Sequence, residues 1–184
     1  MPYAEAAELG VLMGRGDAGL DAAETARAEL LLQLATGVID DETGQSLTMA
    51  TDTVTLDGSG RHRLLLPRWP VTAVATVTVL EDDDSETDLV HGVDYRWTSY
   101  GRLRRIRGCW PCREQAVDVT YTAGYDPIPD GVKAMCLRLA RAGWENGAGK
   151  ESERLGDWAA KWATPGMLPT TGELRTLSIY RART

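Results

Sequence analysis

The spacing of apolar residues changes twice along this chain of 184 residues. Up to residue 39 the apolar side chains recur every three or four positions, which is the period of an amphipathic helix. From Leu47 to Tyr125 they recur at every second position, as in a half-buried strand, and from Asp130 to Trp144 the helical period returns. We therefore expect an α+β fold, mainly a helical bundle with an inserted antiparallel β unit and an extended C-terminal arm that ends in a short helix.

Two regions are expected, a connected core over residues 1–149 and a C-terminal arm with a terminal helix over residues 150–184. The core is expected to combine helices over residues 3–13, 21–39 and 130–145 with a β insertion over residues 47–125.

The second and third helices are expected to pack on each other, each through one apolar stripe. Asp21 stands three residues before Glu24, which is the spacing of a capping box. Acidic residues 40–42 oppose the dipole at a helix C-terminus, so we expect the second helix to stop before them. Its stripe comprises Leu30, Leu31, Leu34, Ala35, Val38 and Ile39, and that of the third comprises Val132, Met135, Cys136, Leu139 and Ala142. The expected contact joins Val132, Met135 and Leu139 to Leu30, Leu34 and Val38.

The β insertion is expected to contain two hairpins and a final strand. An acidic run over residues 81–86 predicts a solvated hairpin tip, and Tyr100-Gly101 predicts a second turn. The last strand is expected at Val117–Tyr121. A long strand before the acidic tip is expected to bury Val71, Ala73, Ala75, Val77 and Val79 on one face.

Composition excludes several classes of protein. The net charge is −7 at pH 7, with a pI near 4.9, which argues against a protein that binds nucleic acid over most of its surface. No apolar run is long enough to cross a membrane, and the N-terminus does not resemble a secretory signal. Three cysteines are too few for a disulfide scaffold, so a reducing cytoplasm is expected.

Cys109-Trp110-Pro111-Cys112 is the one segment that resembles reaction chemistry. A C-x-x-C pair can act in thiol–disulfide exchange, and nearby arginines would favour a thiolate. The following residues lead directly into a strand, however, so no helix dipole is expected to stabilise a charged sulfur. We therefore expect two incidental cysteines in a tight loop. The alternative is a small thiol–disulfide oxidoreductase that uses Cys109 and Cys112.

Other sites have weaker support. Zinc could be bound by these two cysteines with Cys136, His62 or His91, but the paired spacing of a zinc site is absent. The acidic run lacks the pattern of a calcium loop, and no phosphate-binding glycine motif is present. No catalytic, cofactor-binding or metal-binding residue is expected. The arginines over residues 102–107 predict either a basic hairpin, for phosphate or an acidic neighbouring subunit, or a salt-bridged surface strand.

Two features indicate contacts with other proteins. Leu174, Leu177 and Tyr180 lie on one side of a short terminal helix, which is marginal without a partner. We expect this helix to dock in a partner's groove, and the alternative is that it folds back on its own domain. Trp144, Trp158 and Trp162 are expected at an interface between subunits.

The order of these features resembles the head–tail connector (adaptor) proteins of long-tailed bacteriophages, prophages and gene transfer agents. The resemblance covers nearly the whole chain and rests on order and spacing. The residues that carry it are LPRWPVTAVATVTV, GVDYRWTSYGRLRRI and VDVTYTAGYDPIPDGVKAMCLRLA in the middle of the chain, and ESERLGDW and ELRTLSIYR near its end.

The resemblance implies a structural protein of the virion neck, assembled in the host cytoplasm, and no enzyme. It implies a ring of about twelve subunits beneath the portal protein, joining head to tail and extending the DNA channel. The implied partners are the portal, a downstream neck (stopper) protein, further copies of the chain, and genomic DNA that passes without specific binding. The portal-docking residues would be Leu174, Leu177, Tyr180 and Arg181. A cytoplasmic interaction domain is the remaining alternative.

Overall fold

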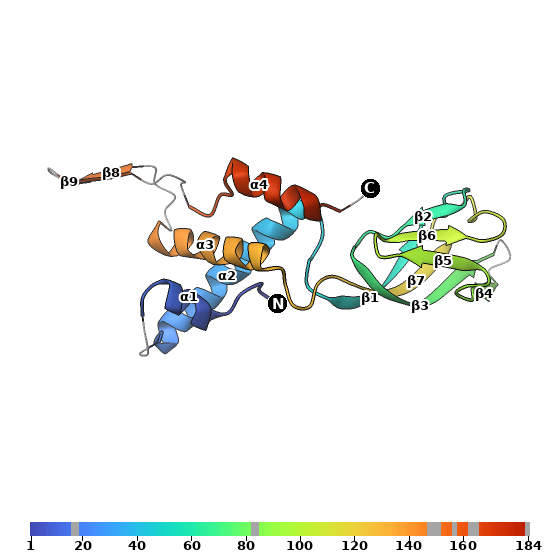
Figure 1. Ribbon diagram of the computed structural model, residues 1–184, viewed down its shortest axis with the longest axis horizontal. Helices are drawn as coiled ribbons and strands as arrows, with labels where there is room; N and C mark the ends of the chain where they lie inside the picture. The colour runs from blue at the N-terminus through green and yellow to red at the C-terminus, as the bar shows by residue number, and fades with distance from the viewer. Residues whose placement is uncertain (16–18, 82–84, 147–151, 156–157, 162–165, 183–184) are drawn as a thin grey trace. The chain divides into compact units, whose positions relative to one another are not determined.

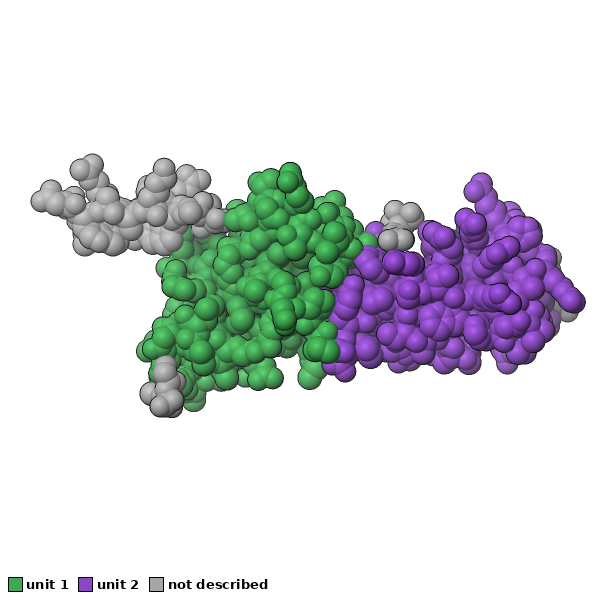
Figure 2. Space-filling model, viewed as in Figure 1, with its two compact units in different colours: residues 1–44, 127–181 green, residues 45–126, 182–184 purple. Residues whose placement is uncertain are grey.

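The computed structural model describes residues 1–15, 19–81, 85–146, 152–155, 158–161 and 166–182. It divides into two compact units, one formed by residues 1–44 and 127–181 and the other by residues 45–126 with the last three residues of the chain (Figure 2). In these described ranges the regular structure of the first unit is helical apart from one short hairpin, and that of the second consists of strands (Figure 1). The expected α+β class is confirmed.

The described part of the helical unit has four α-helices, and the capping box expected at Asp21 is present at the start of the second. The Asp21 carboxylate accepts a hydrogen bond from the Glu24 amide at 2.8 Å. The bounds are α1, Ala6–Leu12; α2, Ala22–Thr43; α3, Asp130–Glu145; and α4, Thr171–Leu177, which is followed by a 3₁₀ turn, Ser178–Tyr180.

The expected end of the second helix at residue 39 is wrong, because α2 continues to Thr43. Gly44 ends it in the left-handed conformation, with a φ of 68°, which glycine adopts without steric cost. Two of the three acidic residues in the last turn, Asp40 and Glu42, interact with a donor or a cation. Tyr3 donates its hydroxyl to Asp40, and Arg181 lies 3.5 Å from Glu42.

The core of this unit lies between α2 and α3. Val132, Met135, Cys136 and Leu139 are buried, as expected. On α2 the expected burial of Leu30 and Leu34 is wrong, since these side chains are 56% and 51% exposed. Leucines surround this part of the helix, so periodicity alone does not select a face. The packing selects a face with smaller side chains that admit a close approach, comprising Ala28, Leu32, Ala35, Thr36, Ile39 and Thr43.

The β unit consists of two antiparallel sheets. A four-stranded sheet has the order β1-β7-β3-β4, and a three-stranded sheet has the order β2-β6-β5. Both expected hairpins are present, β3–β4 and β5–β6. The bounds are β1, Ala50–Leu56; β2, Arg63–Leu65; β3, Val71–Leu80; β4, Glu86–Asp88; β5, Tyr95–Thr98; β6, Arg102–Arg105; and β7, Val117–Ala123.

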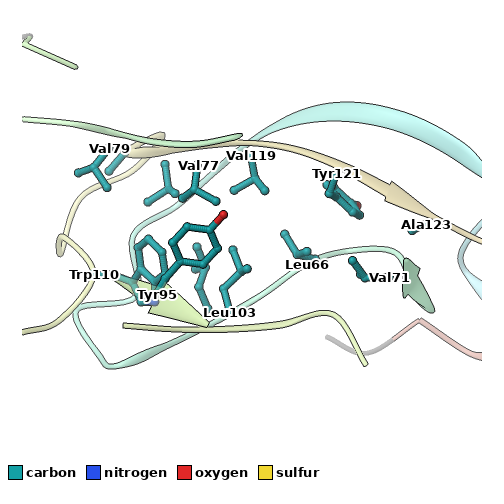
Figure 3. Packing of buried hydrophobic residues seen from close by; sticks show 13 residues of the cluster. Leu66, Val71, Val77, Val79, Tyr95, Leu103, Trp110, Val119, Tyr121 and Ala123 are labelled. Carbon is teal, nitrogen blue, oxygen red and sulfur yellow. The ribbon is translucent and has the colours of Figure 1, made fainter. Parts of the chain in front are cut away.

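One hydrophobic core fills the space between the two sheets (Figure 3). Val77, Val119 and Tyr121 belong to the four-stranded sheet, and Tyr95 and Leu103 to the three-stranded sheet. The aromatic ring of Trp110 completes this core from the loop before β7. All six side chains are at most 2% exposed, so the core between the two sheets is shielded from solvent.

The expected burial of Ala73 and Ala75 is wrong, because both side chains are exposed. The pairing of β3 with β7 shifts between Val71 and Ala73 and again between Val74 and Thr76. Each shift is a bulge that changes which residues face the core. Only the ends of the expected face, Val71, Val77 and Val79, are buried.

The C-terminal region contains regular structure that the sequence analysis did not predict. Two short antiparallel strands, β8 at Ser152–Leu155 and β9 at Trp158–Lys161, pair with each other. None of the described helices is long and apolar enough to cross a membrane.

Candidate interaction surfaces

The C-x-x-C loop is a structural element rather than a reactive one. Cys109 and Cys112 are exposed free thiols, while Trp110 between them is 2% exposed. The loop is held to the β1–β2 turn by a hydrogen bond from the Gly60 amide to the Pro111 carbonyl at 3.0 Å. No helix begins between β6 and β7, so no helix N-terminus stabilises a thiolate at either cysteine. The loop therefore anchors Trp110 in the core of the β unit.

The third cysteine is part of the helical core. The Cys136 sulfur lies 3.7 Å from the Thr36 hydroxyl and 3.8 Å from the Leu32 carbonyl oxygen. Burial raises the pKa of its thiol, which keeps it protonated and inert. Within the described ranges, no three His, Cys, Asp or Glu side chains cluster in a way that would hold a metal ion.

The motif LPRWP, which carries part of the resemblance, has a structural role at the entry to β3. Arg68 forms an ion pair with Asp52 and donates hydrogen bonds to the carbonyls of Ser46, at 3.0 Å, and Thr48, at 2.6 Å. The amide of Trp69 donates to the Gln45 side chain at 2.9 Å. Arg68 therefore ties the start of β3 to the segment that leads into β1.

Of the three tryptophans expected at an interface, Trp144 is half-buried and contacts α2 of its own unit. The guanidinium of Arg27 lies 4.3 Å from the centroid of the indole ring and donates to the Trp144 carbonyl at 3.0 Å. The structure describes only the backbone at Trp158, and Trp162 lies outside the described residues.

The terminal helix α4 lies on its own unit. Leu177 is only 1% exposed, whereas Ile179, which the sequence analysis did not single out, is 63% exposed. Arg138 forms a salt bridge with Glu173, with a 2.8 Å hydrogen bond between Nη2 and Oε2, and Arg181 donates to the Glu42 carbonyl at 3.2 Å. The folded-back arrangement is thus the one adopted by the isolated chain, and docking onto a partner stays a prediction.

A second surface of the helical unit was missed by the sequence analysis. Leu30 and Leu34 lie one turn apart on the exposed side of α2, and Ala26 and Gly37 are exposed on the same side. The signal in the sequence was the run of leucines on all sides of this helix. Such a run places apolar side chains on more than one face of the helix, and here it leaves an exposed apolar face on α2.

Arg102 and Arg104 of the expected basic hairpin lie on the outer face of the three-stranded sheet, whereas Arg105, opposite buried Tyr95, has its guanidinium 5.5 Å from the centroid of the Trp110 ring. Arg104 is directly opposite Arg63 on one side and Arg96 on the other. Arg102 lies two residues from Arg104 on the same strand and therefore on the same face. None of the four forms an ion pair with a described residue, so the expected salt-bridged strand is not what the structure contains.

Comparison with known proteins identifies the family. The sequence profile of the family described as Head completion protein matches residues 18–145, which include α2, the whole β unit and α3. No curated protein matches the chain significantly.

Three solved structures have the same fold. A chain from the neck of an empty gene transfer agent particle, computed with C6 symmetry, is 19% identical, with a TM-score of 0.59 over 90% of this chain and 83% of that chain. A chain from the virion of a native gene transfer agent is 20% identical, with a TM-score of 0.60 over 92% and 83%. A chain from the neck of a native particle, computed with C12 symmetry, is 18% identical, with a TM-score of 0.58 over 97% and 90%.

The family match covers more than half of the chain and agrees with the resemblance seen in its sequence. It confirms a structural rather than a catalytic protein, in keeping with a C-x-x-C loop that serves the core. This chain belongs to the head completion protein family.

Proposed function

We propose that this protein is a neck adaptor that joins the head of a virion to its tail. The observation that carries the proposal is the family match together with a fold shared with neck proteins over nearly the whole chain. Those proteins come from particles computed with C6 and C12 symmetry, which supports a ring of about twelve copies.

In the proposed arrangement the ring lies beneath the portal protein and extends the channel for genomic DNA. A downstream neck (stopper) protein binds the other side of the ring. A net charge of −7 suits a conduit, since an acidic surface repels the phosphate backbone and lets DNA pass without specific binding.

Copies of the chain are proposed to contact one another through the helical unit. Trp144, Trp158 and Trp162 remain the candidates from the sequence, and Leu30 and Leu34 add an exposed apolar face on α2. Burying two leucines that are half exposed would contribute about 2–3 kcal/mol per contact, which is a useful share of a subunit interface.

The segment with Leu174, Leu177, Tyr180 and Arg181 is proposed to dock on the portal. Docking through Leu177 requires this residue to leave its site on its own unit. The ion pairs that hold α4 are partly exposed and contribute about 0–1 kcal/mol each. A portal groove must therefore mainly replace the burial of Leu177, which contributes about 1.5–3 kcal/mol.

Electron microscopy of negatively stained samples tests the proposal. We expect the full-length chain to form closed rings, alone or after mixing with the portal of the same virus, and light scattering to give a mass of about twelve subunits. A chain that stays monomeric in both samples and does not bind the portal would contradict the proposed function.

A further inference from the structure

The outer face of the three-stranded sheet concentrates positive charge without any compensating carboxylate among the described residues. Arg63, Arg104 and Arg96 are paired directly across the neighbouring strands β2, β6 and β5, and Arg102 lies two residues from Arg104 on β6. We call these four residues the arginine face. Like charges directly opposite each other destabilise a sheet, so this arrangement costs stability unless an anionic partner binds it.

A groove beside β2 and β6 opens next to this face. Its volume is about 1240 Å³, and its walls carry Arg61, Arg63, Arg102 and Arg104 together with exposed Leu65 and Ile106. No carboxylate lines it. The groove therefore fits a partner that presents acidic side chains and apolar side chains together.

Two observations favour a protein partner over nucleic acid. Leu65 and Ile106 are each 41% exposed among the arginines, and a phosphate backbone would leave them without apolar contacts. The β unit over residues 45–126 has arginines but no lysine, and protein interfaces are enriched in arginine and depleted of lysine. A ring of such faces around moving DNA would also bind it at many phosphates and impede its passage.

The chain itself has a complementary edge. Glu86 and Asp88 lie two residues apart on β4, which is an edge strand of the four-stranded sheet, and both are exposed. We call them the acidic edge. Thr78 donates a hydrogen bond to the Asp88 carboxylate at 2.7 Å, and neither acid forms an ion pair with a described residue. Val90 lies two residues after Asp88 in the chain, and its side chain is 57% exposed.

The two features match in spacing. Residues two apart on a strand project from one face about 6.8 Å from each other, and this holds both for Glu86 and Asp88 on β4 and for Arg102 and Arg104 on β6. Two carboxylates can therefore meet two guanidinium groups in register, with Val90 available for the apolar side chains of the groove.

We propose that the arginine face of one copy binds the acidic edge of a second copy, head to tail. The two features belong to different sheets of one β unit, so each copy offers both halves of the contact to different neighbours. A contact between unlike surfaces repeats from copy to copy and closes into a ring when the rotation allows it. The inference rests on the proposed ring and assigns the β unit a part in closing it.

The test uses charge reversal in the full-length chain. R102E/R104E reverses the arginine face, E86R/D88R reverses the acidic edge, and R102K/R104K is a control that changes the same two side chains but keeps their charge. Sedimentation velocity measures self-association, and circular dichroism checks that each variant is folded. We expect each of the first two variants to associate at least about 100-fold more weakly than the wild type, because like charges then face each other. The control keeps the attraction between opposite charges and should associate far more strongly than R102E/R104E.

Mixing R102E/R104E with E86R/D88R should restore assembly, since every contact then joins opposite charges again. Wild-type assembly should also weaken as salt is raised from about 0.1 M to about 1 M, where the Debye length falls from about 10 Å to about 3 Å. Three results would each overturn the inference: R102E/R104E that assembles as strongly as the wild type, a mixture that does not recover assembly, or a wild type that never self-associates.

The wild type could instead bind double-stranded DNA, and R102E/R104E could lose this binding while its assembly is unchanged. That result would assign the arginine face to nucleic acid. Rings formed by R102E/R104E would leave the proposed function intact, whereas failure of the wild type to form rings with portal present would contradict that function.

Discussion

Arg27 of α2 lies over the indole ring of Trp144 of α3, 4.3 Å from the ring centroid, and also donates a hydrogen bond to the Trp144 carbonyl. The pair joins the two helices that form the core of the helical unit, close to the end of α3. We predict that R27A lowers the free energy of unfolding by about 1–2 kcal/mol, through loss of the cation–π contact and the hydrogen bond. Urea unfolding measures this. R27K, which keeps the charge, should lose less, and an unchanged midpoint in R27A would contradict the structural role of the pair.

Leu139 on α3 and Leu34 on α2 allow a matched comparison between a buried and an exposed leucine of the helical unit. Leu139 is fully buried, whereas Leu34 is 51% exposed. We predict that L139A costs about 2–5 kcal/mol of unfolding free energy, through lost burial and a cavity, and that L34A costs less than about 1 kcal/mol in the isolated chain. L34A should instead weaken assembly if the exposed face of α2 lies between subunits. Equal losses of stability in the two variants would contradict the assignment of faces on α2.

The C-x-x-C loop is predicted to need its tryptophan and not its cysteines. C109S/C112S should leave stability, assembly and infectivity unchanged, because both thiols are exposed and free. W110A should cost about 3–5 kcal/mol, because the ring fills the core between the two sheets. Thermal unfolding compares the two variants. Loss of particle assembly in a folded C109S/C112S protein would reopen redox or metal chemistry at this loop.

Removal of residues 173–184 tests the terminal helix. We expect the truncated chain to stay soluble and folded but to lose about 1.5–3 kcal/mol, because the site of Leu177 on its own unit is vacated. It should no longer bind the portal in a pull-down assay. I179A is the control, since this side chain is exposed and its loss should not affect stability. A truncated chain that still binds the portal would place docking elsewhere, and one that unfolds would show α4 to be essential to the core.

Acidification is predicted to loosen α4. Burial raises the pKa of Glu173, but hydrogen bonds from Thr170 and the charge and hydrogen bonds of Arg138 outweigh it, and the pKa falls below its ordinary value of 4.5. A lowered pKa means that the folded state favours the carboxylate. This stabilisation is present above the unfolded-state pKa and is lost as the pH falls through the folded-state value. We expect E173Q to reduce stability at neutral pH by about 0.5–1 kcal/mol, and the difference from the wild type to shrink below pH 4.5. A difference that does not change with pH would contradict the role of the charge.

Local features were predictable from the sequence, because each depends on residues close together in the chain. The capping box at Asp21 and Glu24, the turn at Tyr100-Gly101 and the strand that ends at Ala123 are all present. The order and spacing of the segments were sufficient to show the resemblance to head–tail connector proteins.

Non-local features were decided by the tertiary structure. Leucines surround α2, so only packing against α3 determined that Leu32 is buried and Leu34 is exposed. The bulges in β3 follow from its pairing with β7, almost forty residues later, and they turn Ala73 outward. The folding back of α4 depends on partners on distant helices, among them Arg138 of α3.

The arginine face shows the same division. The sequence contains alternating arginines over residues 102–107, which predicted a basic strand, but it does not show what lies beside that strand. Cross-strand register placed Arg63 and Arg96 on either side of Arg104. Sequence alone therefore determined most of the elements, though not β8 and β9, and the family to which the chain belongs, because periodicity, caps and turns are local. Only the tertiary structure decided which surfaces those elements present, because register and packing join residues that are far apart in the chain.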